Sequence, residues 1–292
     1  MKRYLICLCV LCLAYSSTQA QLLWEISGNH LKQKSYLFGT HHLVPISFID
    51  SIPGVYKVFN HCQAVVGEIV ADDPSMIKKM TEAAQIPSYT SISKLLSTSD
   101  YQQVDSALQS VSKMTLSDLD RLKPAMISNL YLISLYNILY PNTNQDWQID
   151  SFFQQVAAQK NIPVLGLESI DKQINILFNA QSLERQAFLL VGAVEATNEA
   201  KAEIKTMNQL YKKGDLNGLL SMYENDTTKY AATQEEQFQM LDNRNEEWAK
   251  TIPQLIHQKS CFIAVGALHL PGENGLIALL RKAGYRVKPV KK

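Results

Sequence analysis

The sequence predicts an α/β (α+β) fold in which both ends of the chain build one central mixed sheet, with a large helical insertion between them. Short apolar runs rich in strand-forming residues lie near the two ends, within residues 22–38, 62–70 and 261–290. Apolar residues at helical spacing fill most of 71–160 and 172–250, which we expect to form a helical cap over the sheet.

The first sheet elements are predicted to be a hairpin and a buried strand. Residues 22–27 have a strand-forming composition and Gly28-Asn29 is a turn signal, so 22–38 predicts a hairpin. The apolar run 62–70 contains Gly67-Glu68. A carboxylate at the end of a buried strand is costly unless it has a partner, which singles out Glu68.

Polar residues mark the starts of the predicted helices. The stretch 126–140 is apolar but is interrupted by Ser and Asn, so it predicts a core helix rather than a membrane span. Asp150 is expected to cap a helix over 151–160. Other expected helix starts are Asp73-Pro74-Ser75, Ser99-Asp100 and Thr115 with Asp118.

The second half of the chain repeats the strand-and-acid pattern before it closes the sheet. Residues 162–167 predict a short strand followed by Glu168, and Gly214-Asp215 breaks the helical stretch that comes next. The final segment predicts a strand at 261–265, a helix at 275–283 and a strand at 285–290, which is a crossover unit.

Residues 1–20 are typical of a secretory signal, and residues 21–292 are expected to form a single domain. Lys2-Arg3 precedes an apolar core, and small residues lead to a cleavage position after Ala20. This predicts export through the Sec route, with the periplasm favoured and the extracellular space as the alternative. A membrane anchor or a lipoprotein signal is disfavoured, and no transmembrane anchor is expected in the mature chain.

Charge and cysteine content exclude some functions. Of 28 basic residues two lie in the signal, so the remaining chain, with 27 acidic residues, has a net charge of −1 and no basic stripe for nucleic acid. Cys62 and Cys261 are the cysteines outside the signal. They could form a disulfide, but burial as small apolar residues is favoured.

One short sequence motif, G-x-x-H, occurs twice, and its two copies are more than two hundred residues apart. Gly39-Thr40-His41-His42 and Gly266-Ala267-Leu268-His269 both follow an apolar run, and both are followed by Leu and then Pro. A single histidine after a strand is more often structural than a ligand. The repetition favours a shared site, because ligands bind beyond the carboxyl ends of strands in open α/β sheets.

The residues at the predicted strand ends suit a divalent ion and a hydrolytic reaction. His42, His269 and Glu68 are candidate ligands for zinc, manganese or cobalt. Two histidines and one acid would hold such an ion, which makes hydroxide available near neutral pH. Of Glu68 and Glu168, the glutamate that remains could accept the proton of the water and pass it to a leaving group.

Further candidates surround these ligands. Arg244 suits a substrate carboxylate or a developing oxyanion, and Asn245 could donate a hydrogen bond beside it. His41 should face away from His42 on an extended segment, which makes it a supporting or structural residue. A surface ion pair for Arg244 and a helix cap for Glu168 are the structural alternatives.

Taken together, these motifs resemble the TraB/GumN family, which is related to the Tiki metalloproteases. The resemblance covers nearly all of the chain after residue 20. It rests on Leu23-Trp24-Glu25-Ile26, Gly39-Thr40-His41-His42, Glu68, Asp150, Gly166-Leu167-Glu168, Gln173, Arg244-Asn245 and residues 265–272.

The resemblance implies a site with both G-x-x-H histidines and the strand-end glutamate, with His41 and Asp150 in supporting positions. It implies metal-dependent proteolysis, with manganese or cobalt favoured, and a peptide or small-molecule substrate. A haem-binding lipoprotein and an esterase share the scaffold, so a non-catalytic metal- or haem-binding protein is the alternative. A surface interaction protein with structural histidines is the third possibility.

Overall fold

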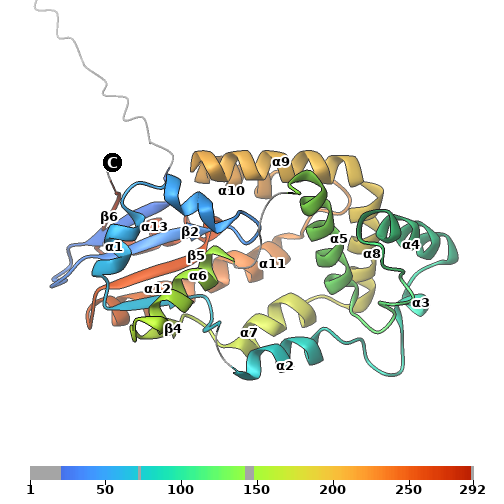
Figure 1. Ribbon diagram of the computed structural model, residues 1–292, viewed down its shortest axis with the longest axis horizontal. Helices are drawn as coiled ribbons and strands as arrows, with labels where there is room; N and C mark the ends of the chain where they lie inside the picture. The colour runs from blue at the N-terminus through green and yellow to red at the C-terminus, as the bar shows by residue number, and fades with distance from the viewer. Residues whose placement is uncertain (1–20, 72–73, 142–147, 291–292) are drawn as a thin grey trace, which may run out of the picture.

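The protein consists of a sheet flanked by helices at one end and a helical part at the other (Figure 1). The structure, a computed structural model, describes residues 21–71, 74–141 and 148–290. The predicted α/β (α+β) fold is confirmed within these residues. The predicted signal at 1–20 and the expected helix-start residue Asp73 lie outside them.

The sheet is mixed and has six strands in the order β4-β3-β5-β2-β1-β6. Strands β4, β3, β5 and β2 are parallel, whereas β1 is antiparallel to both of its neighbours, β2 and β6. The predicted hairpin is β1–β2, and the last strand closes the sheet beside it. The strands are β1 Leu23–Ser27, β2 Ser35–Thr40, β3 Ala64–Gly67, β4 Val164–Gly166, β5 Cys261–Gly266 and β6 Arg286–Pro289.

Helices cover both faces of the sheet, with α1 and α6 on one side and α12 and α13 on the other (Figure 1). The central strands are therefore buried on both faces, which explains their continuous apolar runs. The segments around the sheet are η1 Ile46–Ser51, α1 Val55–His61, α6 Ile149–Gln159, α12 Asn243–Ile256, η4 Ala267–His269 and α13 Leu276–Lys282.

The helical part has a hydrophobic core of its own, which includes Leu108, Tyr131 and Leu190. The predicted core helix at 126–140 is α5, and no helix in the described ranges is long and apolar enough to cross a bilayer. The remaining helical segments are α2 Pro74–Ala83, α3 Ile92–Leu95, α4 Thr98–Ser112, α5 Pro124–Leu139, α7 Ile170–Ile174, η2 Asn175–Asn179, α8 Leu183–Glu195, α9 Thr197–Lys213, α10 Leu216–Glu224, α11 Gln234–Gln237 and η3 Phe238–Asp242. Tyr211 of α9 and Leu216 and Leu219 of α10 belong to the core of the sheet.

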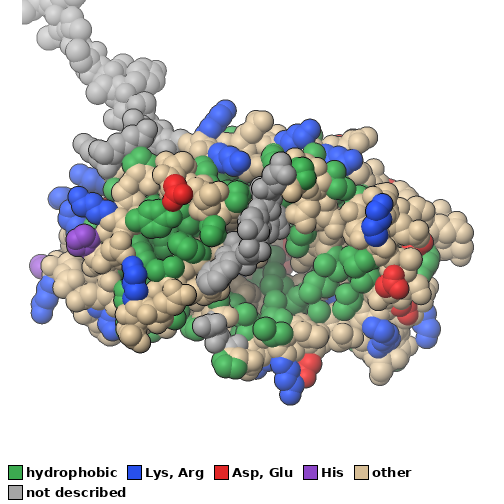
Figure 2. Space-filling model, in the orientation of Figure 1, with side chains coloured by type: hydrophobic (Ala, Val, Ile, Leu, Met, Phe, Trp, Pro, Cys, Tyr) green, Lys and Arg blue, Asp and Glu red, His purple; other side chains and the backbone are tan. Residues whose placement is uncertain are grey.

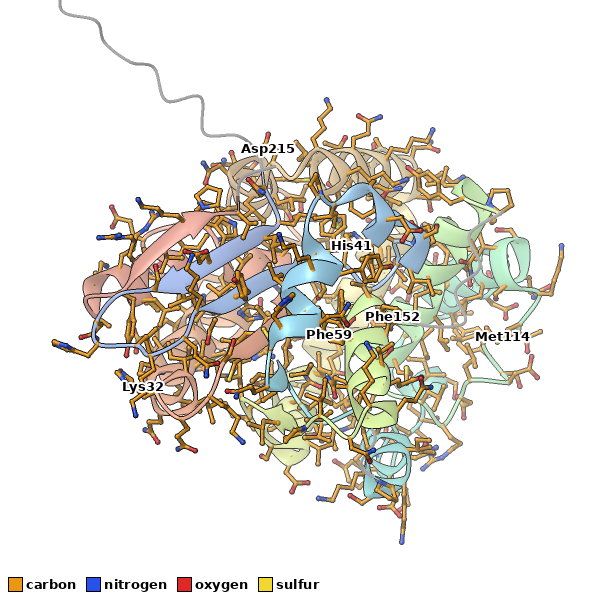
Figure 3. All side chains as sticks on the ribbon, turned by 60° about the vertical axis from the view of Figure 1, so that its left-hand side comes forward. Lys32, His41, Phe59, Met114, Phe152 and Asp215 are labelled. Carbon is orange, nitrogen blue, oxygen red and sulfur yellow. The ribbon has the colours of Figure 1, made fainter. Side chains whose placement is uncertain are left out.

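An aromatic cluster joins α1 and α6 to the sheet. The ring of Phe153 lies 4.6 Å from that of Phe262, 5.1 Å from Phe59 and 5.5 Å from Phe38, measured between centroids. Figure 3 labels Phe59 and Phe152 on this side of the molecule. Helix α6 was expected in the cap, but this packing assigns it to the sheet.

Three predicted helix starts need correction. The N-cap of α4 is Ser97, whose side chain accepts the N–H of Asp100, and not Ser99. Helix α6 begins after Gln148, so Asp150 lies in its first turn and its carboxylate is free to face another residue. Thr115 and Asp118 form the expected reciprocal hydrogen bonds, but only a turn follows them.

Other local predictions are confirmed. Gly214 ends α9 with φ of 71°, and the Asp215 side chain caps α10 by accepting the N–H of Gly218. Cys62 and Cys261 are both buried free thiols, as favoured over a disulfide. Burial raises the pKa of the Cys62 thiol to about 11, which keeps it protonated and unreactive.

Candidate functional site

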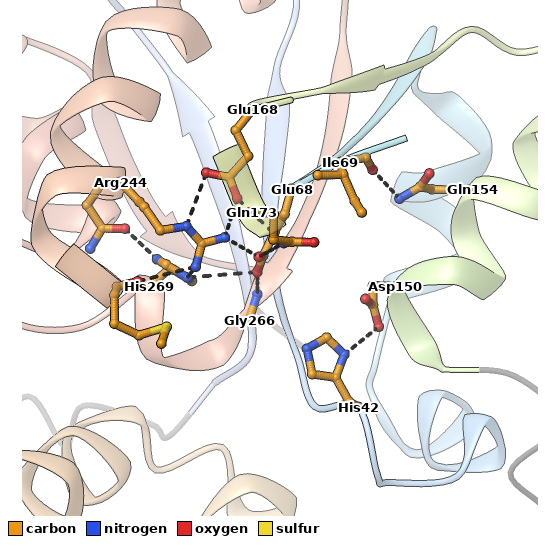
Figure 4. Close-up of polar contacts among 12 residues, drawn as sticks. His42, Glu68, Ile69, Asp150, Gln154, Glu168, Gln173, Arg244, Gly266 and His269 are labelled. Atoms are coloured by element: carbon orange, nitrogen blue, oxygen red, sulfur yellow. Dashed lines mark hydrogen bonds and ion pairs between the residues drawn. The ribbon is translucent and has the colours of Figure 1, made fainter. Parts of the chain in front are cut away.

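The predicted site residues gather at one edge of the sheet, where the four parallel strands end (Figure 4). His42 is the second residue after β2, Glu68 the first after β3, Glu168 the second after β4 and His269 the third after β5. Backbone pairing continues past the strands, because the N–H of Glu168 donates to the carbonyl of Glu68 at 2.9 Å. Parallel strand ends meet at one edge, so four distant parts of the sequence converge there.

Arg244 lies at the centre of this edge and binds both glutamates. Its Nε and Nη2 donate to the two oxygens of Glu168 at 3.1 and 2.7 Å, and Nη2 also donates to Glu68 Oε2 at 2.5 Å. The side chain of Arg244 is 6% exposed and that of Glu168 is 1% exposed. The two carboxylates and the planar fork form a buried cluster in which the single cation faces two anions.

The helix that carries Arg244 has an irregular turn before it. The π-helical segment η3 directly precedes α12, and such turns are frequent at functional sites. Arg244 Nη1 donates back to the carbonyl of Met240 at 3.2 Å, within this turn. Trp248, one helical turn later and fully buried, packs its ring 4.6 Å below the guanidinium. The helix therefore holds Arg244 from both sides.

His269 is held in one tautomer. Arg244 Nη1 lies 3.1 Å from His269 Nε2, and an arginine can only donate, so Nε2 is the acceptor. The proton is then on Nδ1, which donates to Asn245 Oδ1 at 2.7 Å. Burial lowers the pKa of His269 to about 4, so the ring is neutral at neutral pH. Asn245 thus accepts from His269, while its own amide donates to the Asn274 carbonyl at 3.0 Å.

Glu68 is the more accessible of the two carboxylates, with a side chain that is 15% exposed. Its Oε1 accepts the N–H of Gly266 at 2.8 Å and lies 3.8 Å from His269 Nε2. Burial favours the protonated acid, but His269, Arg244 and the Gly266 N–H outweigh it and lower the pKa of Glu68 to about 2. Glu68 is therefore ionised at neutral pH.

His42 lies at the same edge of the sheet, on the side where α6 packs, and its side chain pairs with Asp150 of that helix. Its Nδ1 lies 3.3 Å from Asp150 Oδ1, and its side chain is 55% exposed. The hydrogen bond and charge of Asp150, together with the charge of Glu68, raise the pKa of His42 to about 9. Its second ring nitrogen points towards the Arg244 cluster (Figure 4).

His41 makes contacts of a structural kind. Its ring packs against Tyr211, with centroids 5.2 Å apart, and its Nδ1 accepts the N–H of Leu43 at 3.1 Å. Burial, with the neighbouring charge of His42, lowers the pKa of His41 to about 4. His41 therefore fixes the turn that presents His42.

Gln154 was not identified from the sequence, yet it fixes the chain that follows Glu68. Its Nε2 donates to the Ile69 carbonyl at 3.0 Å and its Oε1 accepts the N–H of Ala71 at 2.8 Å. A Cβ on Gly67 would lie 2.2 Å from Gln154 Nε2 and 2.9 Å from the backbone carbonyl oxygen of Ile69, so a larger residue would displace both. Spacing offers a signal, because Gln154 lies one helical turn after Asp150.

The imidazole and carboxylate groups at this edge are ligands that suit a divalent metal. In this structure Arg244 contacts these groups. Both candidate histidines direct Nδ1 to a side-chain oxygen, of Asp150 or of Asn245, which is how proteins orient metal-binding imidazoles. Within residues 21–71, 74–141 and 148–290, however, no three His, Cys, Asp or Glu side chains form a group that could hold a metal. The guanidinium of Arg244 contacts the donor atoms of Glu68 and His269 instead.

The protein is thus of the α/β class, and its candidate site consists of histidine, glutamate and arginine side chains at the carboxyl ends of parallel strands. The sequence profile of the TraB/PrgY/gumN family matches residues 22–289. The chain belongs to this family. No solved structure shows a significant match to it.

Curated relatives are similar to nearly the whole chain at low identity. Metalloprotease TIKI1 of Xenopus tropicalis is 26% identical over 92% of this chain, and metalloprotease TIKI2 of Danio rerio is 24% identical over 91%. A metalloprotease TIKI homolog of Nematostella vectensis is 24% identical over 88%. The matches cover 62%, 60% and 65% of these relatives, so the chain spans somewhat less than two thirds of their length.

Proposed function

We propose that this chain is an exported, metal-dependent hydrolase that cleaves peptide bonds at the carboxyl edge of its sheet. Its similarity to metalloproteases supports the class. One geometric observation carries the assignment of the site: His42 and His269 each have Nδ1 held by a side-chain oxygen and Nε2 directed inwards. His42, His269 and Glu68 would hold the ion, which is manganese, cobalt or zinc.

A bound divalent ion supplies Lewis-acid polarisation and hydroxide near neutral pH. Glu68 is the carboxylate that accepts a proton from water, since it is 15% exposed and Glu168 is 1% exposed. Glu168 orients Arg244 through two hydrogen bonds. Arg244, once its Nη groups leave Glu68 and His269, can donate to a substrate carbonyl or carboxylate.

The surface between the two parts of the molecule supports an extended substrate. The part of the surface between the sheet and the helical part that is visible in Figure 2 is hollowed and carries hydrophobic side chains. The carboxyl ends of the parallel strands point towards the helical part (Figure 1). We assign this hollow to a peptide whose apolar side chains lie along it, with a smaller molecule as the alternative.

Calorimetric titration with Mn²⁺, Co²⁺ and Zn²⁺ tests the site, together with hydrolysis of a broad peptide library. We expect His42→Ala and His269→Ala to lose metal binding and hydrolysis while they stay folded. His61→Ala is the matched control, because His61 lies on the surface and contacts the Lys57 carbonyl. A folded chain that binds none of the three metals contradicts the proposal, and metal binding without hydrolysis identifies a binding protein.

A further inference from the structure

One buried hydroxyl at this edge has no assigned role. Thr40 is the last residue of β2 and is 2% exposed, and its Oγ1 has no hydrogen-bond partner among the residues that the structure describes. A buried hydroxyl without a partner costs about 1–3 kcal/mol. Such a cost at the end of a central strand needs an explanation.

The register of the sheet directs this side chain to the candidate site. Thr40 pairs with Gly266 on the parallel strand β5, and paired residues on neighbouring strands point to the same face. A Cβ on Gly266 would lie 3.3 Å from Glu68 Oε1 and 3.5 Å from His269 Cδ2. Thr40 therefore points to the face of Glu68 and His269, about one strand spacing of ~4.8 Å from Gly266.

The packing of the preceding residues agrees with this direction. Phe38, two residues earlier on the same face, packs against Phe153 of α6 at 5.5 Å. The same helix carries Asp150, the partner of His42. The hydroxyl thus lies on the face of the sheet where both histidines and Glu68 meet.

We propose that Thr40 is a further catalytic residue, whose hydroxyl holds the water that is consumed in hydrolysis beside Glu68. This inference rests on the proposed function. In the reaction the water oxygen bonds to the carbonyl carbon, its proton passes through Glu68 to the leaving amine, and the C–N bond breaks. Thr40 makes and breaks no covalent bond, and its hydroxyl fixes the position of the water.

The variants Thr40→Val and Thr40→Ser separate this role from a structural one. Valine keeps the branched shape and removes the hydroxyl, so kcat/KM for the peptide substrate should fall about 10- to 100-fold. Thr40→Ser keeps the hydroxyl and should retain most of the activity. Because no protein partner is lost, the midpoint of thermal unfolding of Thr40→Val should equal or exceed that of the unmodified chain.

Ser128→Ala is the matched control, since Ser128 Oγ is also buried and without a partner among the described residues, but lies in α5 of the helical part. It should leave kcat/KM unchanged. Full activity of Thr40→Val, or a lowered unfolding midpoint with unchanged activity, would overturn the role of Thr40.

A crystallographic comparison decides the question without turnover. In crystals of the unmodified chain we expect an ordered water within hydrogen-bond distance of Thr40 Oγ1 and a Glu68 oxygen, and we expect Thr40→Val to lose it. A protein group bonded to Oγ1 instead would overturn the inference. If the unmodified chain cleaves no peptide, the proposed function fails, and this comparison still decides whether Thr40 positions water.

Discussion

Two arginines in this protein bind glutamate with the same forked geometry, yet they lie in different environments. Arg244 binds Glu68 and Glu168 in a cluster where the three side chains are 6%, 15% and 1% exposed. Arg185 of α8 binds Glu236 of α11 with Nε and Nη2 at 3.0 and 2.9 Å, and these side chains are 23% and 19% exposed. The comparison asks what distinguishes the arginine of the proposed site from an arginine that only holds two helices together.

The partners of the two arginines differ more than their geometry. Arg185 also donates to the Ala231 carbonyl, and Glu236 closes a capping box with Thr233. These contacts stabilise the start of α11 and hold it against α8. Arg244 instead contacts His269 and stacks on Trp248. A forked ion pair alone therefore does not mark a functional site. The Arg244 pair differs from the Arg185 pair because it shares its atoms with a neutral histidine at converging strand ends, and on this difference we base the proposed site.

The largest effect is expected for Arg244→Met. Removing the cation leaves Glu68 and Glu168 buried side by side, so the free energy of unfolding should fall by about 3–5 kcal/mol. Arg244→Lys, which keeps the charge but loses the fork, should lose less. Urea unfolding followed by circular dichroism measures both variants, and a loss below about 1 kcal/mol for Arg244→Met contradicts the cluster described here.

Metal addition sharpens this prediction. If Arg244 competes with a divalent ion for Glu68 and His269, then Mn²⁺ should raise the unfolding free energy of Arg244→Met more than that of the unmodified chain. Equal stabilisation of both proteins would show that arginine and metal do not share donor atoms.

A smaller effect is expected for Arg185→Met. The pair it removes is partly exposed to solvent, so we expect a loss of about 1–2 kcal/mol in the free energy of unfolding. Metal affinity and peptide hydrolysis should stay unchanged, because the contacts described for Arg185 are with Ala231, Glu236 and the Phe188 ring, away from the sheet edge. Calorimetry with Mn²⁺ on this variant is the measurement, and a tenfold change in affinity would remove the distinction between the two clusters.

Much of the fold could be predicted from local patterns in the sequence. The apolar runs at both ends became β1, β2, β3, β5 and β6, and Gly214-Asp215 broke the long helical stretch as expected. Helix starts were harder to place, because Ser97 and Ser99 are equally good caps by composition. The assignment of α6 to the sheet depends on Phe153 reaching Phe262, a contact between distant segments that spacing does not reveal.

Several residues of the candidate site could be named from the sequence, but Gln154 and the connections between the residues could not. Two copies of G-x-x-H and two strand-end glutamates pointed to His42, His269, Glu68 and Glu168, and these do lie at one edge of the sheet. The sequence did not reveal that Arg244 would bridge the glutamates, or that Asn245 would accept from His269. Those roles depend on the irregular turn η3, which sets the rotation of α12 and has no clear sequence signal.

The smallest effect concerns acid, and it follows from the pKa of Glu236. Its hydrogen bonds from Arg185 lower the pKa of Glu236 to about 2, from an ordinary value of 4.5. A carboxyl whose pKa is lowered by folding stabilises the folded state above its unfolded pKa, and this stabilisation is lost as the pH falls from about 4.5 to about 2. The contribution should be about 1 kcal/mol at neutral pH, because the pair is partly exposed.

Glu236→Gln isolates this contribution from that of Glu68, whose pKa is also lowered to about 2. At pH 7 the variant should be less stable than the unmodified chain by about 1 kcal/mol. The difference should stay nearly constant down to about pH 5 and shrink as the pH falls from there to 3. Both proteins should still lose stability together below about pH 4.5, because each keeps Glu68, whose folded-state pKa is also lowered and whose contribution falls over the same range of pH. Urea unfolding between pH 3 and pH 7 measures the two curves, and a difference that stays constant with pH would mean that the Arg185 pair does not set the charge of Glu236.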